Sequence, residues 1–299
     1  YTTLFRSVDW RERPLVSLLT AALLLWGARA RCPFGPRLQA CCAGLSRISY
    51  WVFLIHYPLI MLFGVVVERL WPGQPLPAAA GLLAADLLLE LERRDCLPER
   101  YGILELSGEL RERQFDTLAA KVPHLASRVQ WLDGLPERFS GALVANEVLD
   151  VMPVHLIAWR PEGIFERGVA LGDEGRFVWA DQPAAGKVAE AAVALDLPLP
   201  EEGEYVSELN LAGRAWVAEW AARLDKGAML LVDYGYPRAE YYLPSRSTGT
   251  LLCYFRHHAH GDPFLWPGLN DITAFVDFTA IAEAGFDAGL DAQGYTTQA

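Results

Sequence analysis

The chain has 299 residues, of which 52% are hydrophobic and 21% charged, a composition that excludes a disordered or collagen-like protein. Its net charge of −11 argues against a protein that binds nucleic acid through phosphate contacts. Residues 1–90 carry eight arginines, no lysine and five acidic residues, so all of the negative excess lies in the remainder. The five cysteines are odd in number and no pair has zinc-knuckle spacing, so we expect neither a disulfide framework nor a structural metal.

The first 80 residues predict membrane-spanning helices. Residues 1–7, YTTLFRS, look like a translated sequencing adapter, so we expect them to be no part of a fold. Residues 48–67 carry no formal charge and are long enough to span a hydrocarbon layer of about 30 Å. A shorter apolar run, 14–28, could span only marginally, and the loop between the two runs carries arginines and no acid. We therefore expect about two transmembrane helices within residues 8–80, with this loop on the cytoplasmic side of an inner or plasma membrane.

Part of this region resembles a known membrane family. The string LSRISYWVFLIHYPLI, residues 45–60, resembles the late helices of the membrane acyltransferase 3 family, which move acyl groups onto sugars and similar acceptors. The family's early helix, with its catalytic histidine, is absent, so we expect no acyl transfer from this part alone. His56 lies within the apolar run, where it is either a functional residue or a neutral imidazole bonded to a neighbouring helix.

From residue 81 onward the pattern changes to alternating helices and strands. Helical periodicity marks two segments, and short apolar runs between and after them read as buried strands. The expected helices are 81–95 and 108–120, and the expected strands are 101–106, 127–132 and 141–146. Strands that alternate with helices at this spacing predict a parallel sheet in an α/β domain.

The next segment interrupts that alternation. Three runs separated by turn residues, 154–160, 164–171 and 176–180, predict an antiparallel meander inserted into the domain. The pattern then predicts, in chain order, a helix over 206–224, strands over 228–236 and near 249–255, and a helix near 271–284.

Polar residues follow three of the expected parallel strands. Ligands of open α/β sheets bind beyond the carboxyl ends of the strands, so these residues are candidates for a site. They are Glu105 after the first strand, Asn146, Glu147 and Asp150 after the third, and Asp233 with Tyr234 after the fourth. An acid placed like Glu105 can accept hydrogen bonds from both hydroxyls of a ribose. The alternative for each acid is that it is solvated or caps a helix.

Several motifs together resemble one family. YGILELSGELRERQ (101–114), GALVANEVLDVMPVHLIAW (141–159), YVSELN (205–210) and LLVDYGYP (230–237) have the order and spacing of the MidA-like class I S-adenosylmethionine-dependent methyltransferases. The resemblance runs from about residue 81 to residue 299. It implies a Rossmann-like class I methyltransferase sheet with S-adenosyl-L-methionine as cofactor. Mitochondrial members are protein arginine methyltransferases that assist assembly of respiratory complex I, which implies a protein substrate.

The resemblance also implies roles for individual residues. Glu105 would bind the cofactor ribose, with Ser107 beside it, Asp133 near the adenine and Asn146 near the methionine end. A guanidinium stays protonated, so carboxylates are needed to hold it and direct one nitrogen at the methyl group. Three acids are the candidates for this catalytic role: Glu147, Asp150 and Glu208. The remaining substrate-binding candidates are Asp233, Tyr234 and His260. Methyl transfer needs no metal, so none is expected.

The sequence departs from the family pattern before the helix that begins near Gly81. The family's first strand and glycine-rich loop should stand there, but residues 71–81, WPGQPLPAAAG, contain no G-x-G spacing. We therefore expect a sheet that lacks its first strand, weak or absent cofactor binding, and a domain (81–299) truncated at both ends. Phe275 also stands where the family commonly has histidine.

Four interpretations follow from this departure. The first is an impaired cytoplasmic arginine methyltransferase domain, whose eukaryotic relatives are mitochondrial. The alternatives are a methyltransferase tethered to a membrane, a non-catalytic adaptor, and a chimera with a membrane acyltransferase fragment created by misassembly.

Overall fold

The computed structural model describes residues 51–55, 79–198, 200–255 and 258–296, which belong to two compact units. The first unit contains the described residues up to Asn146, residues 223–231 and the C-terminal residues from Gln293. The second unit contains residues 147–222 and 232–292. The chain therefore passes from the first unit to the second at the Asn146–Glu147 peptide bond.

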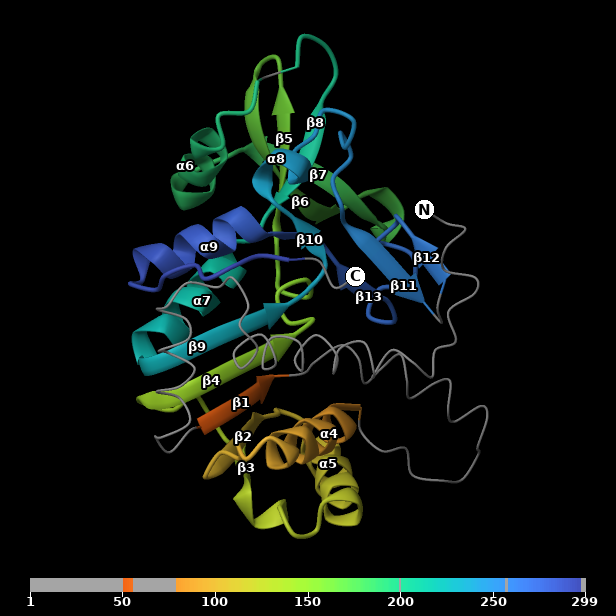
Figure 1. The fold of residues 1–299 in the computed structure, drawn as a ribbon. Coiled ribbons are helices and arrows are strands. Elements are labelled where there is room, and N and C mark those ends of the chain that lie inside the picture. Colours follow the sequence, from red (N-terminus) through yellow and green to blue (C-terminus); the bar gives the residue numbers. More distant parts are fainter. Residues whose placement is uncertain (1–50, 56–78, 199, 256–257, 297–299) are drawn as a thin grey trace. The chain divides into compact units, whose positions relative to one another are not determined.

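The first unit is built on a five-stranded sheet in the order β3-β2-β1-β4-β9 (Figure 1). Its strands are β1 (Trp51–Ile55), β2 (Arg100–Leu104), β3 (Val129–Leu132), β4 (Phe139–Asn146) and β9 (Leu224–Val232). The pairs β1–β2, β1–β4 and β2–β3 are all parallel, as the alternation of strands and helices predicts.

The prediction that the sheet lacks its first strand is wrong. Strand β1 occupies the middle of the sheet, where Trp51 pairs with Arg100 of β2 on one side and Gly141 of β4 on the other. These five residues come from the apolar run 48–67, which was expected to be a membrane helix. Strands buried on both faces and membrane helices both read as continuous apolar runs, so periodicity does not distinguish them.

The part of the chain that the structure describes contains no helix that is both long and apolar enough to span a membrane. The other expectations for the N-terminal region concern the adapter-like residues 1–7, the apolar run 14–28, His56 and most of residues 71–81. They fall outside the described residues.

Two helices complete the described core of the first unit, α4 (Ala79–Arg93) and α5 (Gly108–Lys121). Residues of both helices form one buried cluster with residues of β2 and β3: Leu88, Tyr101, Ile103, Leu118 and Val129 are among its members. Gly81 lies at the contact between the helices, where a Cβ atom would come within 3.0 Å of the Gln114 Cα atom. A side chain at this position would therefore push the two helices slightly apart.

The second unit contains the predicted meander as part of a four-stranded antiparallel sheet in the order β7-β6-β5-β8. Its strands are β5 (His155–Arg160), β6 (Gly163–Leu171), β7 (Phe177–Pro183) and β8 (Tyr205–Leu209). Helix α6 (Gly186–Ala194), which the sequence pattern did not predict, buries Ala192 against Ile157 and Trp159 of β5. The meander prediction is thus confirmed, with one added strand and one added helix.

The second unit also contains three α-helices and two groups of short strands. They are the helices α7 (Leu211–Arg223, whose last residue belongs to the first unit), α8 (Arg238–Tyr241) and α9 (Phe278–Asp287), the parallel pair β10 (Gly235–Tyr236) and β14 (Val276–Asp277), and the antiparallel strands β12 (His258–His260), β11 (Leu252–Phe255) and β13 (Asp271–Thr273).

Two predicted helices begin later than expected. The segment 206–224 begins as strand β8, and α7 starts only after Asn210, whose side-chain oxygen accepts a hydrogen bond from the Gly213 N–H at 2.6 Å. In the segment 271–284, two short strands precede α9, and Asp277 caps that helix by accepting from the Thr279 N–H at 3.0 Å. In both cases a capping side chain determines where the helix begins.

Candidate active site

The carboxylate of Glu105 lies directly beyond the end of β2 and is buried, with 2% of the residue exposed. Its Oε1 atom accepts a hydrogen bond from the Ser107 N–H at 3.0 Å, and its Oε2 atom accepts one from Gln114 Nε2 at 3.0 Å. A carboxylate has about four acceptor positions. Glu105 is therefore held in one orientation and keeps acceptor capacity on both oxygens, which suits a ligand with two neighbouring hydroxyls.

Gln114 fixes this orientation from α5, a role that the sequence did not reveal. It is fully buried, and its Oε1 atom accepts a hydrogen bond from the indole N–H of Trp131 at 2.8 Å. The Trp131 bond determines which end of the Gln114 amide faces Glu105. The only signal in the sequence is that Gln114 and Leu118 are four residues apart and so share the buried face of α5.

Arg111, another residue missed by the sequence interpretation, connects the carboxyl ends of β2 and β3. Its guanidinium donates to the Glu105 carbonyl oxygen at 2.6 Å, to the Leu132 carbonyl oxygen at 2.7 Å and to Asp133 Oδ1 at 2.6 Å. The Asp133 carboxylate is otherwise exposed. Ser107 uses its hydroxyl to cap α5, accepting from the Leu110 N–H at 3.3 Å. Through these contacts, Ser107 and Arg111 hold the loops beside Glu105 in place.

Asn146, at the end of β4, carries a buried donor that no described residue satisfies. The residue is buried, and its Nδ2 atom makes no hydrogen bond within the described part of the chain. Leaving such a donor unpaired costs about 1–3 kcal/mol. A ligand that presents a carbonyl or carboxylate oxygen here would remove that cost. Together with Glu105, this makes the strand ends of the first unit suitable for a nucleoside that carries an amino-acid group.

In the second unit, Asp233 organises the turn that follows β4. Its Oδ2 atom accepts hydrogen bonds from the backbone N–H groups of Val148 at 3.1 Å, Leu149 at 2.8 Å and Asp150 at 3.3 Å. Its Oδ1 atom accepts from the Tyr234 N–H at 2.8 Å. Asp233 thus caps this turn, and capping is the alternative that the sequence left open for each acid at a strand end. The prediction that Asp233 binds substrate gains no support from these contacts.

This turn holds Glu147 and Asp150, two of the three predicted catalytic acids. Glu147 has a positive φ of 51°, a left-handed conformation that is costly for a residue with a side chain. Such strain is common where a protein positions functional groups. The Glu147 N–H donates to the Val232 carbonyl oxygen at 2.8 Å, which fixes the start of the turn.

The carboxyl group of Asp150 is buried, with 7% of the residue exposed, and its Oδ1 atom has no hydrogen-bond partner among the described residues. Burial, followed by repulsion from Asp233, Glu147 and Asp271, raises the pKa of Asp150 to about 8. Asp150 therefore carries a proton at neutral pH when no cation is bound beside it.

Asp150 lines a cavity of about 400 Å³ that lies within the second unit. Glu166, Arg167 and Trp179 of the antiparallel sheet form one part of its wall, and Ile272 of β13 forms another. The Glu166 carboxylate is held by His155, whose Nδ1 atom lies 2.7 Å from Glu166 Oε1. Neither Tyr234 nor His260, both predicted to bind substrate, is among the residues that line this cavity.

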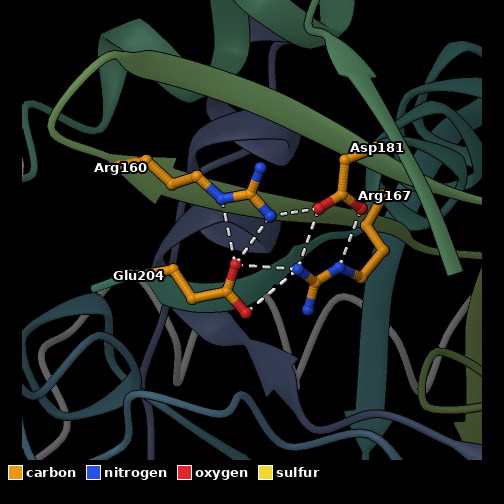
Figure 2. A network of polar contacts seen from close by, with 4 residues as sticks. All are labelled: Arg160, Arg167, Asp181 and Glu204. Atoms are coloured by element: carbon orange, nitrogen blue, oxygen red, sulfur yellow. Dashed lines mark hydrogen bonds and ion pairs between the residues drawn. The ribbon is translucent and has the colours of Figure 1, made fainter.

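An ion-pair network crosses the antiparallel sheet beside this cavity (Figure 2). Arg167 donates to Asp181 Oδ1 at 2.9 Å and to Glu204 Oε2 at 2.8 Å, and Arg160 bonds the same two acids. The hydrogen bond from Arg167 lowers the pKa of Asp181. The charge of Arg167 is therefore balanced inside the network, and the cavity is not made cationic by this side chain.

Glu208 was predicted to bind the methyl acceptor, but the structure gives it an internal role. Its carboxylate is buried and accepts hydrogen bonds from the N–H groups of Thr250 at 2.8 Å and Leu251 at 2.9 Å. The Tyr241 hydroxyl, at 3.0 Å, and the Thr250 hydroxyl, at 3.1 Å, donate to its other oxygen. The Ser207 hydroxyl also donates to this oxygen, at 3.5 Å, so with five donors already bound Glu208 has little capacity left for a substrate.

We expect the Asp150→Asn variant to gain stability over the parent protein as the pH rises. An unfolded aspartate ionises near pH 3.9, whereas native Asp150 keeps its proton to about pH 8. Between these values the native state binds more protons, so the parent loses up to about 1.4 kcal/mol of unfolding free energy per pH unit from this group. Asparagine cannot ionise and avoids the loss. Denaturant unfolding at pH 5 and pH 8 measures the difference. Asp173→Asn is the control, because Asp173 is exposed in the three-residue 3-10 helix Asp173–Gly175, and an equal response of both variants would contradict the prediction.

Residues 76–296, almost three quarters of the chain, match the model of a protein family described as "Putative S-adenosyl-L-methionine-dependent methyltransferase". The chain belongs to this family. Its cofactor is accordingly S-adenosyl-L-methionine, which agrees with the two observations at the strand ends, the oriented Glu105 carboxylate and the unpaired Asn146 amide.

Solved structures and a curated relative agree with this assignment. A crystal structure from Burkholderia thailandensis with bound S-adenosyl-homocysteine is 44% identical, with a TM-score of 0.70, over 89% of this chain and 61% of that one. A native crystal structure from the same organism is 44% identical, with a TM-score of 0.72, over 92% and 64%. The mitochondrial "Protein arginine methyltransferase NDUFAF7 homolog" of Drosophila melanogaster is 28% identical over 157 residues, 50% of this chain. The chain spans less than two thirds of both structures and a third of the curated relative.

These matches confirm the MidA-like methyltransferase resemblance and the mixed α/β methyltransferase fold. They give no support to an acyltransferase fragment, a membrane partner or a chimera. The predicted loss of the glycine-rich loop concerns residues outside the described part, and it gains no support either. The predicted boundaries at residues 7 and 80 stay predictions.

Proposed function

We propose that this chain carries the core of an S-adenosyl-L-methionine-dependent protein arginine N-methyltransferase. The observation that carries the acceptor assignment is the buried Asp150 carboxyl, which leaves one oxygen without a partner among the described residues and lines a cavity. The family membership supports methyl transfer, and the name of the Drosophila relative supports arginine in a protein as the acceptor. By the family resemblance, that protein is a subunit of a respiratory complex.

The first unit supplies residues to hold the cofactor. Glu105 accepts the ribose hydroxyls, and the Asn146 amide donates to the carboxylate of the methionine portion. Asp133, fixed by Arg111, lies next along the sheet edge and is assigned to the adenine. The sulfonium group of the bound cofactor supplies the methyl group.

The second unit supplies the acids that face the acceptor. A guanidinium remains protonated at working pH, and its methylation releases one proton when the new N–C bond forms. Glu147 and Asp150 hold the guanidinium through charge-assisted hydrogen bonds and direct one nitrogen. Binding of the cation favours the ionised form of Asp150, and the resulting carboxylate can accept the proton that methylation releases.

Transfer of a labelled methyl group tests this function. The protein is incubated with S-adenosyl-L-methionine labelled on the methyl group and a hypomethylated protein extract, and the modified residue is identified by amino-acid analysis. We expect methylarginine. Asp150→Asn and Glu147→Gln should each lower the rate about 100-fold, because positioned acid–base groups contribute factors of 10²–10⁴. Neither variant should change the affinity for S-adenosyl-homocysteine by more than about twofold, since neither residue is assigned to the cofactor.

Glu190→Gln, on the exposed surface of α6, is the matched control and should keep full activity. Label found on lysine or on a small molecule would contradict the arginine assignment. Unchanged rates in both acid variants would contradict the assignment of these acids to the acceptor.

A further inference from the structure

The cavity of the second unit has two chemically different parts. One part is acidic, because Asp150 and Glu166 both line it, and Asp150 keeps an oxygen without a partner among the described residues. The other part is apolar and includes Val169, Trp179 and Ile272. A side chain with an aliphatic stem and a cationic head has the complementary chemistry.

The apolar part is open to solvent and formed by paired strands. Val169 of β6 lies directly opposite Trp179 of β7, so the two side chains stand on the same face of the sheet. They are 55% and 40% exposed, respectively, and Ile272 is 42% exposed. The Trp179 ring also packs against Phe264, with ring centroids 4.6 Å apart, which restrains its orientation. An ordered, exposed indole can stack on a guanidinium and on the aliphatic stem that carries it.

The ion-pair network keeps the cavity receptive to a cation. Arg167 lines the cavity, but Asp181 and Glu204 bind its guanidinium (Figure 2). Without these two acids, the charge of Arg167 would repel a positively charged ligand. The network therefore removes this repulsion, while Asp150 keeps one oxygen without a partner among the described residues and Glu166 keeps its contact with His155.

We propose that this cavity is the entry site for the arginine side chain of an extended protein segment, with the stem against Trp179 and Val169 and the guanidinium at Asp150 and Glu166. The inserted antiparallel sheet then determines which acceptor is used, and Trp179 is a specificity-determining residue. This inference rests on the proposed function, because it takes arginine as the acceptor. The proposed function assigned Glu147 and Asp150 to the acceptor. This inference goes further, because it also gives a role to the apolar wall of the cavity, to Glu166 and to the ion-pair network.

Peptide binding to the full chain saturated with S-adenosyl-homocysteine tests the proposal without requiring catalysis. The probe is a glycine-rich peptide with one arginine, titrated by NMR. Trp179→Ala and Val169→Asp should each raise its dissociation constant at least tenfold. Trp266→Ala is the matched control, because Trp266 is also exposed and packs on one phenylalanine, Phe255, but does not line the cavity. All three variants should keep the parent's affinity for S-adenosyl-homocysteine, which also shows that they fold.

The same peptide with citrulline in place of arginine should bind the parent at least tenfold more weakly, because it lacks the charge. A third peptide carries lysine in place of arginine, and binding of this peptide as tight as that of the arginine peptide would overturn the guanidinium assignment. If Trp179→Ala and Trp266→Ala bound the arginine peptide with the same dissociation constant, the proposal that the cavity is the entry site would be wrong, even if the protein formed methylarginine. If peptide binding depends on Trp179 but the product contains no methylarginine, the cavity inference stands and the proposed function falls.

Discussion

Replacing Glu105 by glutamine is expected to weaken binding of S-adenosyl-homocysteine by roughly 10- to 100-fold. Hydrogen bonds to a charged group contribute about 1.5–3 kcal/mol each, and the substitution removes the charge while keeping the shape. The new amide also places an N–H₂ group against a donor, either the Ser107 N–H or Gln114 Nε2. The remaining oxygen can then no longer serve both the protein and the ribose. Isothermal titration calorimetry measures the affinity.

A comparison of two ligands separates ribose binding from a general disturbance of the site. The parent protein should bind adenosine more tightly than 2′,3′-dideoxyadenosine, and Glu105→Gln should abolish that preference. Glu109→Gln, on the exposed first turn of α5, should retain it. A variant that binds both nucleosides weakly but keeps their ratio would show that Glu105 does not contact the ribose.

Replacing Glu208 by leucine is expected to lower the unfolding free energy by about 3–5 kcal/mol, because each buried donor left without an acceptor costs about 1–3 kcal/mol. The leucine leaves the Thr250 and Leu251 N–H groups without their acceptor and removes one partner of the Tyr241 hydroxyl. The backbone of Gly249 packs closely against the Glu208 carboxylate, so the branched leucine side chain must also fit beside this glycine. A Cβ atom at Gly249 would lie 2.3 Å from Glu208 Oε1. Urea unfolding monitored by circular dichroism measures the loss.

Glu190→Leu is the control for this prediction, since Glu190 is exposed on α6 and its replacement should change stability by no more than about 0.5 kcal/mol. If Glu208→Leu were as stable as the control but unable to transfer methyl groups, Glu208 would face the acceptor, as the sequence predicted. The stability measurement therefore decides between the catalytic and the structural role of this acid.

Local patterns in the sequence were sufficient for most elements between residues 100 and 183. Alternating strands and helices predicted β2, α5, β3 and β4 within a few residues, and turn residues predicted the meander β5–β7. Hydrophobic periodicity and turn chemistry act over a few neighbouring residues, so they can be read without knowing the fold. They were insufficient for β8, where buried residues on both faces of a strand were mistaken for the first turn of α7.

The apolar run around β1 required the tertiary structure. Five apolar residues can lie in a membrane helix or in the middle of a parallel sheet, and both environments exclude water. Pairing with β2 and β4 identifies the strand, and neither partner is close to it in the sequence. A strand whose neighbours lie about 50 and 90 residues away leaves no local signal of its pairing.

The sequence by itself determined which acids follow the strands, because residue type and spacing are local properties, and its motifs carry the resemblance to a methyltransferase family. Only the tertiary structure separated the roles of these acids. Asp233 receives its three turn donors from residues 83 to 85 positions away, and Glu208 receives the Thr250 N–H from 42 positions away, whereas one oxygen of Asp150 has no donor in the described chain. A carboxylate whose oxygens are occupied by the protein's own N–H and O–H groups stabilises the fold, and one with an unpaired oxygen in a cavity can bind a ligand. That difference depends on donors that only folding brings into contact.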